Sequence, residues 1–366
     1  MNKHKFAEVF TPPELVKEIL EKIEKIEKIE KIETIKRSRI YEPGVGKGAF
    51  LKQIKDFVSY DGCEINPTQE FEQENINIFK GDFFNHELKE YDLIIGNPPF
   101  YNDGFKGPPC AKSRKGKTIW PQIVKRCWDH LAPNGILAMV LPCIWLKPDK
   151  EKIYDLFTSH KILYLRVYTC VESNKLFNYK AQTPCCYVIV QKTKAFEPNI
   201  IKIYDQTKDN FVSFTLKSGY CIPTQNAELI QSFKPTMKIN PIKIAFIKKE
   251  LETQIIKEPK PDKNIYPLIT TYKDTIYGYE STTPGKYQGI PKIIMAHKTF
   301  PILFLDKEGT YGLYGRDKYI FTSTDSDSNL LEQYEYLSQP IVQKIIKSFT
   351  IRMNFIEKDI FKYISL

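Results

Sequence analysis

The feature that most constrains this chain is a series of short apolar runs, each ended by Gly, Asn, Asp or Pro, with helical segments between them. This alternation is typical of βαβ units. We therefore expect an α/β fold with a doubly wound, mostly parallel sheet, whose ligands lie at the carboxyl ends of the strands. The predicted strands are 39–42, 58–63, 76–80, 93–96, 136–142, 162–168 and 186–191, and the predicted helices include 49–56 and 120–130.

The same pattern divides the chain into three expected parts. Residues 1–38 form an N-terminal segment with a charged helix, and residues 39–195 form the α/β domain. From about residue 196 to 366 the alternation fades while Pro, Lys and aromatic residues become frequent. We expect this last part to be a second domain of α+β character.

Residues 21–30 repeat Glu, Lys and Ile with a period of three. An isoleucine at every third position moves around a helix that has about 3.6 residues per turn. We therefore expect a solvated low-complexity helix without a sustained apolar face, and an interaction helix is the alternative.

Composition narrows the class of protein. The 366 residues carry 54 Lys and Arg against 44 Asp and Glu, and this net charge of +10 favours a polyanionic partner. No apolar run approaches the roughly 20 residues that span a bilayer, and the N-terminus lacks a signal-peptide core. The eight cysteines show no Cys-x-x-Cys spacing and the five histidines are dispersed. We expect a soluble protein of a reducing compartment such as the cytoplasm, with free thiols and no metal site.

The first motif is the strand end and glycine-rich turn that contain Glu42, Pro43, Gly44, Gly46 and Gly48. Glycines let the backbone approach a ligand closely. The spacing departs from the dinucleotide-binding pattern G-x-G-x-x-G, although that kind of site remains the competing interpretation. Glu42 can accept a hydrogen bond from a cationic amino group, which favours a ligand with an amino acid moiety.

Acidic residues also end the next two predicted strands. Glu64 follows the second strand, where a carboxylate can bind both hydroxyls of a ribose. Asp82 follows the third strand and can accept from an adenine amino group, while Phe83 packs on the ring. These positions predict a ligand that contains a nucleoside, and a structural turn is the alternative at each.

The fourth motif, Asn97-Pro98-Pro99-Phe100, directly follows a buried strand and is the most specific signal in the chain. Two prolines end the strand and fix the backbone, so Asn97 is held at the carboxyl edge of the sheet. The Asn97 amide oxygen and the Pro98 carbonyl can accept the two hydrogens of an amino group. This leaves the nitrogen lone pair free to attack a sulfonium methyl group, while Phe100 stacks on the ring that bears the nitrogen.

With these four motifs in order, residues 6–190 resemble the gamma class of amino-methyltransferases, the DNA adenine-N6 methyltransferases, in which a target recognition domain follows the catalytic domain. The resemblance implies a Rossmann-like methyltransferase fold, S-adenosylmethionine as the cofactor and double-stranded DNA as the partner. It also implies that residues 1–38 fold over the cofactor and that residues 196–366 recognise the DNA.

The resemblance further implies roles for particular residues. Those implied to bind the cofactor are Thr11, Glu42, Pro43, Gly44, Gly46, Glu64, Ile65, Asp82, Phe83, Asn97 and Pro99. Those implied to catalyse transfer are Asn97, Pro98, Pro99 and Phe100. Those expected to contact the substrate are Phe100, Phe177 or its substitute Tyr179, and Lys112, Arg114 and Lys115 of the basic loop 103–118. Core packing is the alternative for Phe177, and a solvated loop is the alternative for 103–118. In the second domain, the candidates for contacts with bases or phosphates are Lys286, Lys292, His297, Lys298, Arg316 and Lys318.

The predicted activity is therefore site-specific methylation of a flipped-out adenine in DNA, because the amino group is otherwise paired within the duplex. We expect a monomer in the cytoplasm or the DNA-containing compartment of a host cell. The sequence leaves open a separately encoded cognate restriction endonuclease as a further partner. Methylation of RNA adenine or of a protein glutamine would keep the chemistry and change the substrate. A non-catalytic DNA specificity protein is the alternative from another class.

Overall fold

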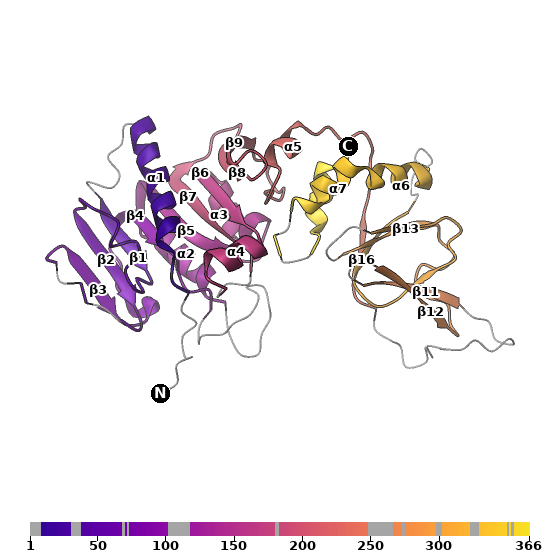
Figure 1. Ribbon diagram of the computed structural model, residues 1–366, viewed down its shortest axis with the longest axis horizontal. Helices are drawn as coiled ribbons and strands as arrows, with labels where there is room; N and C mark the ends of the chain where they lie inside the picture. The colour runs from indigo at the N-terminus through magenta and orange to yellow at the C-terminus, as the bar shows by residue number, and fades with distance from the viewer. Residues whose placement is uncertain are drawn as a thin grey trace. The chain divides into compact units, whose positions relative to one another are not determined.

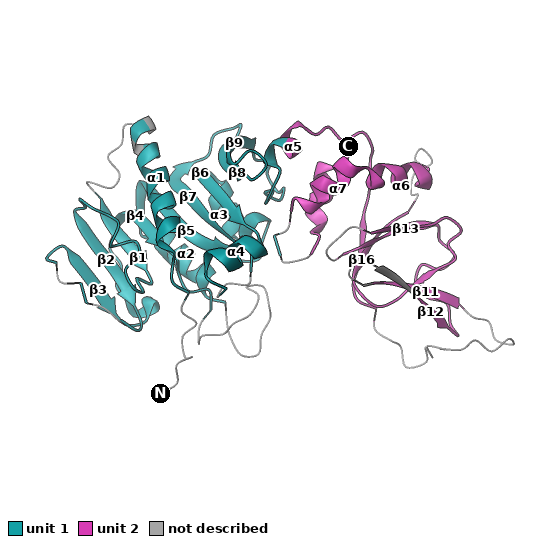
Figure 2. Ribbon diagram, in the orientation of Figure 1, with its two compact units in different colours: residues 1–228, 351–353 teal, residues 229–350, 354–366 magenta. Residues whose placement is uncertain are grey.

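A computed structural model of the protein contains two compact units (Figure 1). The structure describes residues 9–30, 38–67, 70–71, 73–101, 118–179, 183–247, 266–272, 275–297, 302–322, 329–349, 351–352 and 355–366. Unit 1 comprises residues 1–228 and 351–353, and unit 2 comprises residues 229–350 and 354–366 (Figure 2). Among the described residues, no helix has the length and apolar character needed to cross a membrane.

Unit 1 is built on one nine-stranded sheet with the order β3-β2-β1-β4-β5-β7-β6-β8-β9. Strands β1 to β5 run parallel to one another, whereas β7 is antiparallel to both β5 and β6. The strand order reverses beside β1, so the predicted doubly wound, mostly parallel sheet is confirmed. The strands are β1 (Arg39–Pro43), β2 (Ser59–Glu64), β3 (Ile76–Lys80), β4 (Tyr91–Gly96), β5 (Leu131–Pro142), β6 (His160–Tyr168), β7 (Cys185–Lys194), β8 (Ile200–Asp205) and β9 (Asn210–Thr215).

The first unit extends beyond residue 195, where the sequence predicted the boundary. Strand β8 pairs with β6 in parallel and β9 pairs with β8, so both strands continue the same sheet. Helix α5 (Ala227–Ser232) then crosses the division between the units at Glu228. The predicted boundary is early because β8 and β9 mix exposed residues with buried ones and lack the continuous buried runs of β5 and β7.

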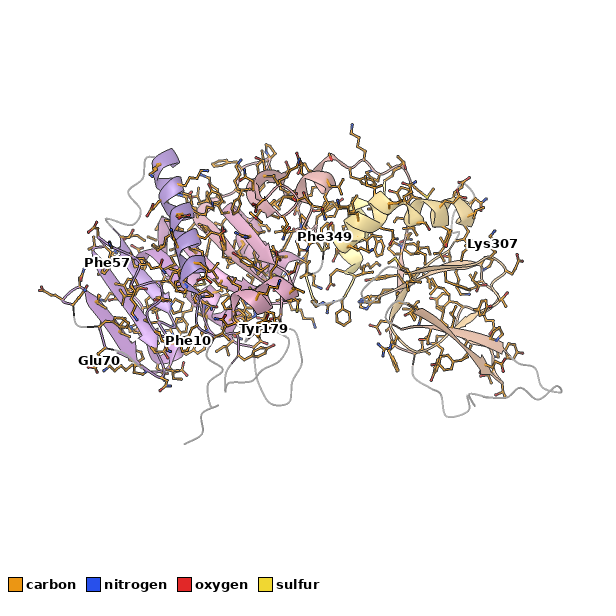
Figure 3. The ribbon with its side chains drawn as sticks, in the orientation of Figure 1. Phe10, Phe57, Glu70, Tyr179, Lys307 and Phe349 are labelled. Atoms are coloured by element: carbon orange, nitrogen blue, oxygen red, sulfur yellow. The ribbon has the colours of Figure 1, made fainter. Side chains whose placement is uncertain are left out.

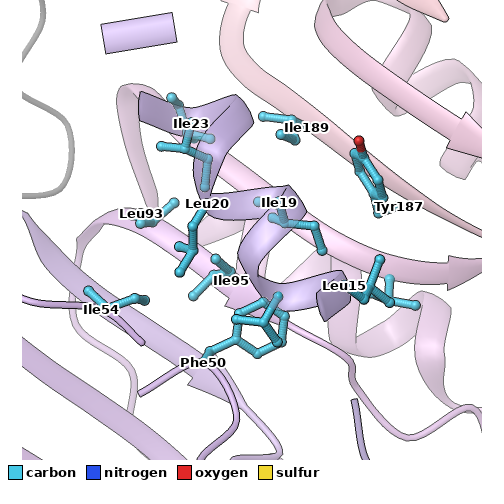
Figure 4. Packing of buried hydrophobic residues seen from close by; sticks show 14 of the residues in the cluster. Leu15, Ile19, Leu20, Ile23, Phe50, Ile54, Leu93, Ile95, Tyr187 and Ile189 are labelled. Atoms are coloured by element: carbon cyan, nitrogen blue, oxygen red, sulfur yellow. The ribbon is translucent and has the colours of Figure 1, made fainter. Parts of the chain in front are cut away.

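Helix α1 (Pro13–Glu30) corrects the prediction of a solvated helix, because one side of it belongs to the hydrophobic core of unit 1. Its buried residues pack on the sheet against Leu93, Ile95, Tyr187 and Ile189 (Figure 4). The period-three repeat drifts by only about 60° per repeat, so its first isoleucines stay on the apolar stripe that precedes them. The buried residues of α1 are Leu15, Val16, Ile19, Leu20, Ile23 and Ile26.

An ion-pair network also attaches α1 to the sheet. The Glu18 carboxylate accepts hydrogen bonds from Arg166 at 2.7 and 2.8 Å, from Tyr187 at 2.8 Å and from Tyr168 at 3.3 Å. The Arg166 guanidinium also lies over the Tyr204 ring, 3.9 Å from its centroid. These contacts connect the helix with β6, β7 and β8.

The other helices of unit 1 follow the predicted pattern with one exception. Helix α2 (Trp120–Asp129) matches the prediction, and α3 (Ile153–Thr158) and α4 (Cys170–Leu176) are further helices. The predicted helix 49–56 is instead a succession of turns. Its backbone hydrogen bonds mix the i to i−3 and i to i−4 patterns. The amides of Gln53 and Ile54 both donate to the Phe50 carbonyl, so no regular helix forms.

Unit 2 has the expected α+β character. A four-stranded sheet has the order β10-β16-β13-β14, and a three-stranded sheet has the order β12-β11-β15. The strands are β10 (Ile242–Ile244), β11 (Tyr266–Tyr272), β12 (Thr275–Ser281), β13 (Lys292–Ala296), β14 (Leu303–Asp306), β15 (Gly312–Leu313) and β16 (Lys318–Phe321). Helices α6 (Leu330–Ser338) and α7 (Pro340–Lys347) and the 3-10 helix Lys358–Tyr363 complete the unit.

Candidate active site at the carboxyl edge of the sheet

The glycine-rich turn after β1 is shaped by left-handed backbone conformations. Gly44 and Gly46 have φ angles of +91° and +55°, which L side chains rarely adopt. The amides of Gly44 and Val45 both donate to the Cys63 carbonyl at 3.0 Å, so the turn is held against the end of β2. A Cβ atom added at Gly44 would lie 3.5 Å from Pro99, which brings the glycine turn and the Asn-Pro-Pro-Phe segment together.

Glu64 connects the turn with the end of β2. Its carboxylate accepts from the Gly46 amide at 2.7 Å and from the Asn66 amide at 2.9 Å. The side chain is half-buried, and Ile65 beside it is 51% exposed. The site therefore offers a fixed carboxylate next to a bare apolar side chain, a combination that suits a ribose and the ring attached to it.

Glu42 is buried at the end of β1, where the Tyr60 hydroxyl donates a hydrogen bond to it. Burial raises the pKa of the Glu42 carboxyl well above its usual value, and the bond from Tyr60 opposes that rise. No Lys or Arg of the described residues forms an ion pair with Glu42. The ammonium group of an amino acid ligand would supply the missing cation, so the residues here fit the methionine end of S-adenosylmethionine.

Sequence reasoning missed Tyr60. The register pairs Ile40 with Tyr60 and Glu42 with Gly62, so alternation puts Tyr60 on the same face of the sheet as Glu42. A Cβ atom at Gly96 would lie 3.3 Å from Glu42 on the other side, which explains the glycine directly before Asn97. The alternation of residues along β2 could have indicated Tyr60, but only if the register of β2 against β1 had been known.

Asp82 and Phe83 follow β3, as predicted. Asp82 is exposed and caps the 3-10 helix η1 (Phe83–Asn85) by accepting from the Phe84 amide at 2.9 Å. The Phe83 ring is buried, and the Arg126 guanidinium lies 5.3 Å from its centroid. The neighbouring Phe84 is 42% exposed. Because the Phe83 ring is already largely packed, only its edge could make the predicted contact with an adenine ring.

The Asn97-Pro98-Pro99-Phe100 segment follows β4 at the same edge of the sheet. Asn97 is half-buried, and its amide nitrogen donates to the Val9 carbonyl at 3.4 Å. No donor to the Asn97 amide oxygen is present among the described residues. Pro98 is buried, Pro99 is exposed and Phe100 is half-buried. The arrangement leaves one amide acceptor and one aromatic ring available to a planar substrate.

The N-terminal segment lies over this edge of unit 1. Besides the bond from Asn97 to Val9, the Phe10 ring faces Gly46, where an added Cβ atom would lie 3.6 Å from it. The Lys47 ammonium group lies 4.5 Å from the centroid of the same ring. Thr11 is half-buried between Phe10 and the first turn of α1. The proximity of residues 9–11 to both motifs supports the expectation that they cover a cofactor.

The two aromatic residues proposed for the substrate differ in environment. Phe177 is 4% exposed and belongs to the hydrophobic core of unit 1, which favours core packing over base stacking for this residue. Tyr179 is 73% exposed and adopts a left-handed conformation with φ of +61° (Figure 3). The turn after α4 therefore buries the first ring and exposes the second, so Tyr179 is the remaining candidate.

The basic loop begins directly beyond the Asn-Pro-Pro-Phe segment. Tyr101 and Thr118 form an antiparallel bridge, and the Ile119 amide donates to the Phe100 carbonyl at 3.1 Å. Both ends of the loop are thereby held next to Phe100. Lys112, Arg114 and Lys115 lie outside the described residues.

In unit 2, three of the cations proposed for DNA contacts are internal. Lys292, His297 and Lys318 are buried, with exposures of 2% or less. Lys286 is exposed, whereas Lys298 lies outside the described residues. Composition could not separate internal from external cations, because buried lysines require partners that only the fold reveals.

The strand order and the motifs on successive strand ends define a Rossmann-like methyltransferase domain. Residues 18–177 match the family model of the Eco57I restriction-modification methylase, and this match confirms the family resemblance for that part of the chain. The match includes the ends of β1 to β4, where the candidate site residues lie.

Individual relatives match a smaller segment. A Type II methyltransferase M.CvrRI from Paramecium bursaria Chlorella virus XZ-6E is 36% identical over 116 residues, which are 29% of this chain and 30% of the relative. Modification methylase CviBIII from Paramecium bursaria Chlorella virus NC1A is 27% identical over 116 residues, 28% of this chain and 30% of the relative. The chain thus matches less than a third of the length of these relatives.

Among solved structures, the methyltransferase subunit of a type I restriction-modification system from Streptococcus thermophilus has a TM-score of 0.37 and 18% identity. The match covers 56% of this chain and 50% of that subunit.

Proposed function

We propose that the protein is a DNA adenine-N6 methyltransferase of a restriction-modification system that uses S-adenosylmethionine. The observation that carries the proposal is the meeting of the Asn97 segment with the glycine turn, where Pro99 approaches Gly44. This proximity puts an acceptor for an amino group beside the predicted cofactor loop. The match of residues 18–177 to a restriction-modification methylase supports DNA as the substrate.

S-adenosylmethionine supplies an activated methyl group on a sulfonium. Glu42 would bind the ammonium of its methionine part and Glu64 the ribose hydroxyls, with Ile65 against the adenine. These contacts would fix the cofactor beside Asn97, and orientation of this kind accounts for a large part of catalysis in group transfer.

The residues of the fourth motif would act on the target adenine. The Asn97 amide oxygen and the Pro98 carbonyl accept its two amino hydrogens, and Phe100 stacks on its ring. Bound S-adenosylmethionine would supply the methyl group and would leave as S-adenosylhomocysteine, while Asn97 and Pro98 hold the amino group with its lone pair free. One amino proton then leaves to solvent. Each step requires the base outside the duplex.

Transfer of a labelled methyl group to unmethylated DNA tests the proposal. After digestion of the DNA to nucleosides, the label is expected in N6-methyladenine, and the same reaction with Asn97→Ala provides the background. Label in RNA, in a protein glutamine or in cytosine would contradict adenine-N6 methylation of DNA. Cofactor binding without transfer to any of these substrates would favour a non-catalytic specificity protein.

A further inference from the structure

A pocket in unit 2 is lined by residues that belong to none of the motifs of the candidate active site. It has a volume of about 440 Å³, which falls within the range of pockets that hold small ligands. Its lining comes from the end of β10 and from the turn before β13, and comprises Lys243, Ile244, Ala245, Phe246, Ile247, Lys286 and Tyr287. All of these residues belong to unit 2 (Figure 2).

The open side of the pocket combines an aromatic ring with positive charge. Phe246 is 59% exposed, and Lys243 and Lys286 are exposed as well. Neither lysine has an ion-pair partner among the residues that the structure describes. An exposed aromatic ring that shares a pocket with two lysines suits a planar group that carries negative charge.

A buried ion pair fixes one wall of the pocket. The Lys292 ammonium donates to Asp306 at 2.6 Å and also to the Tyr287 carbonyl at 3.0 Å. The Leu313 amide donates to the Lys286 carbonyl at 2.8 Å, so the backbone of both wall residues is held from within the unit. Buried Lys292 thus positions the wall, and the side chain of Lys286 stays exposed.

A second buried lysine fixes the segment behind the opposite wall. Lys318 donates to the carbonyls of Tyr314 and Arg316, and the Ile247 amide donates to the Gly315 carbonyl at 2.8 Å. Ile247 also packs on the core of unit 2. Because both walls are attached to the core, the pocket is preformed, and a ligand would bind without ordering it first.

We propose that this pocket binds one nucleotide of the DNA substrate, with its base stacked on Phe246 and its phosphates beside Lys243 and Lys286. The proposal rests on the proposed function and assigns to unit 2 a particular point of contact with DNA. Stacking on an aromatic ring requires a base that is accessible outside its stack, so the contact would select for a locally opened or distorted duplex.

Binding of a fluorescein-labelled, unmethylated duplex that the wild-type protein methylates tests the proposal by fluorescence anisotropy. Phe246→Ala in the full chain is expected to weaken binding about tenfold, whereas Phe246→Trp should retain the affinity because it keeps a stacking surface. The double variant Lys243→Ala/Lys286→Ala should reduce the slope of log affinity against log salt by about two. Lys344→Ala, an exposed lysine on α7, is the matched control and should leave the slope unchanged.

Duplexes with a single abasic site at successive positions separate stacking from general weakening. One position is expected to lose affinity for the wild-type protein but not for Phe246→Ala, since the base and the ring form one contact. Equal losses for both proteins at every position, with a normal salt slope for the double lysine variant, would overturn the proposal. The labelled-methyl assay on wild-type protein decides the proposed function separately, because the pocket can fail while adenine methylation stands.

Discussion

The Tyr60 hydroxyl donates a hydrogen bond to the Glu42 carboxylate, and both side chains are buried below the glycine turn. Burial raises the pKa of Glu42 in the folded protein, so the folded chain holds a proton that the unfolded chain has already lost. The free energy of unfolding therefore falls as the pH rises toward and through that raised pKa. Glu42→Gln should therefore stabilise the cofactor-free protein at pH 8 by roughly 1–3 kcal/mol and gain less at pH 5. The same change should weaken cofactor binding, because the cation of the ligand loses its partner.

Urea unfolding at pH 5 and pH 8, together with calorimetric titration of S-adenosylhomocysteine, measures both effects. Glu87→Gln, an exposed carboxylate in the same unit, is the control and should change neither. An equal unfolding free energy for wild type and Glu42→Gln at both pH values would refute the assigned cost of the buried charge.

Asn97→Ala is expected to reduce methyl transfer by roughly 10²–10³-fold or more, because it removes an acceptor that is needed as charge develops on the amino nitrogen. Cofactor affinity should change little, since the Asn97 side chain donates its hydrogen bond to the backbone of Val9. Single-turnover transfer and cofactor titration on one preparation separate the two quantities.

Glu64→Ala provides the opposite control for Asn97→Ala. It removes the carboxylate that accepts from Gly46 and Asn66, so the cofactor KM should rise about tenfold or more while saturated transfer persists. If Asn97→Ala and Glu64→Ala changed the same kinetic constant, the separate roles given to the two residues would be wrong.

Tyr179→Ala should lower methyl transfer about tenfold without loss of stability, because Tyr179 is exposed and available for stacking on the substrate base. Phe177→Ala should instead destabilise the protein by roughly 3–5 kcal/mol, since the ring lies in the core. Thermal unfolding and transfer assays of both variants measure the contrast. Full activity of Tyr179→Ala would exclude this residue from substrate binding.

The sequence predicted the strand ends of unit 1 well because glycines, prolines and apolar runs are local signals. The meeting of Glu42 with Tyr60 was not predictable in this way, because it depends on the register of two strands. Lys292 illustrates a different limit. In the sequence, Lys292 cannot be distinguished from a lysine that binds DNA. Only its ion pair with Asp306 in the folded protein reveals that the charge is internal.

Helix α1 provides a test of packing within a low-complexity repeat. Ile23→Ala should lower the free energy of unfolding by roughly 2–4 kcal/mol, because Ile23 is buried against the sheet. Lys25→Ala alters the same repeat at an exposed position and should change stability by less than about 0.5 kcal/mol. Urea unfolding compares the two variants, and equal stability would restore the interpretation of a solvated spacer.

Lys318 offers a test of pH dependence in unit 2. Burial lowers its pKa to about 8, so the unfolded chain binds more protons at Lys318 than the folded chain between about pH 8 and 10.5. Stability must rise with pH in this window, because protonated lysine disfavours the fold and its neutral amine can still donate to the Tyr314 and Arg316 carbonyls. The wild type should gain about 2 kcal/mol relative to Lys318→Met from pH 8 to pH 10. Chemical unfolding at several pH values measures this difference, with Lys307→Met as the exposed control, and a difference that stays constant with pH would show that Lys318 titrates normally.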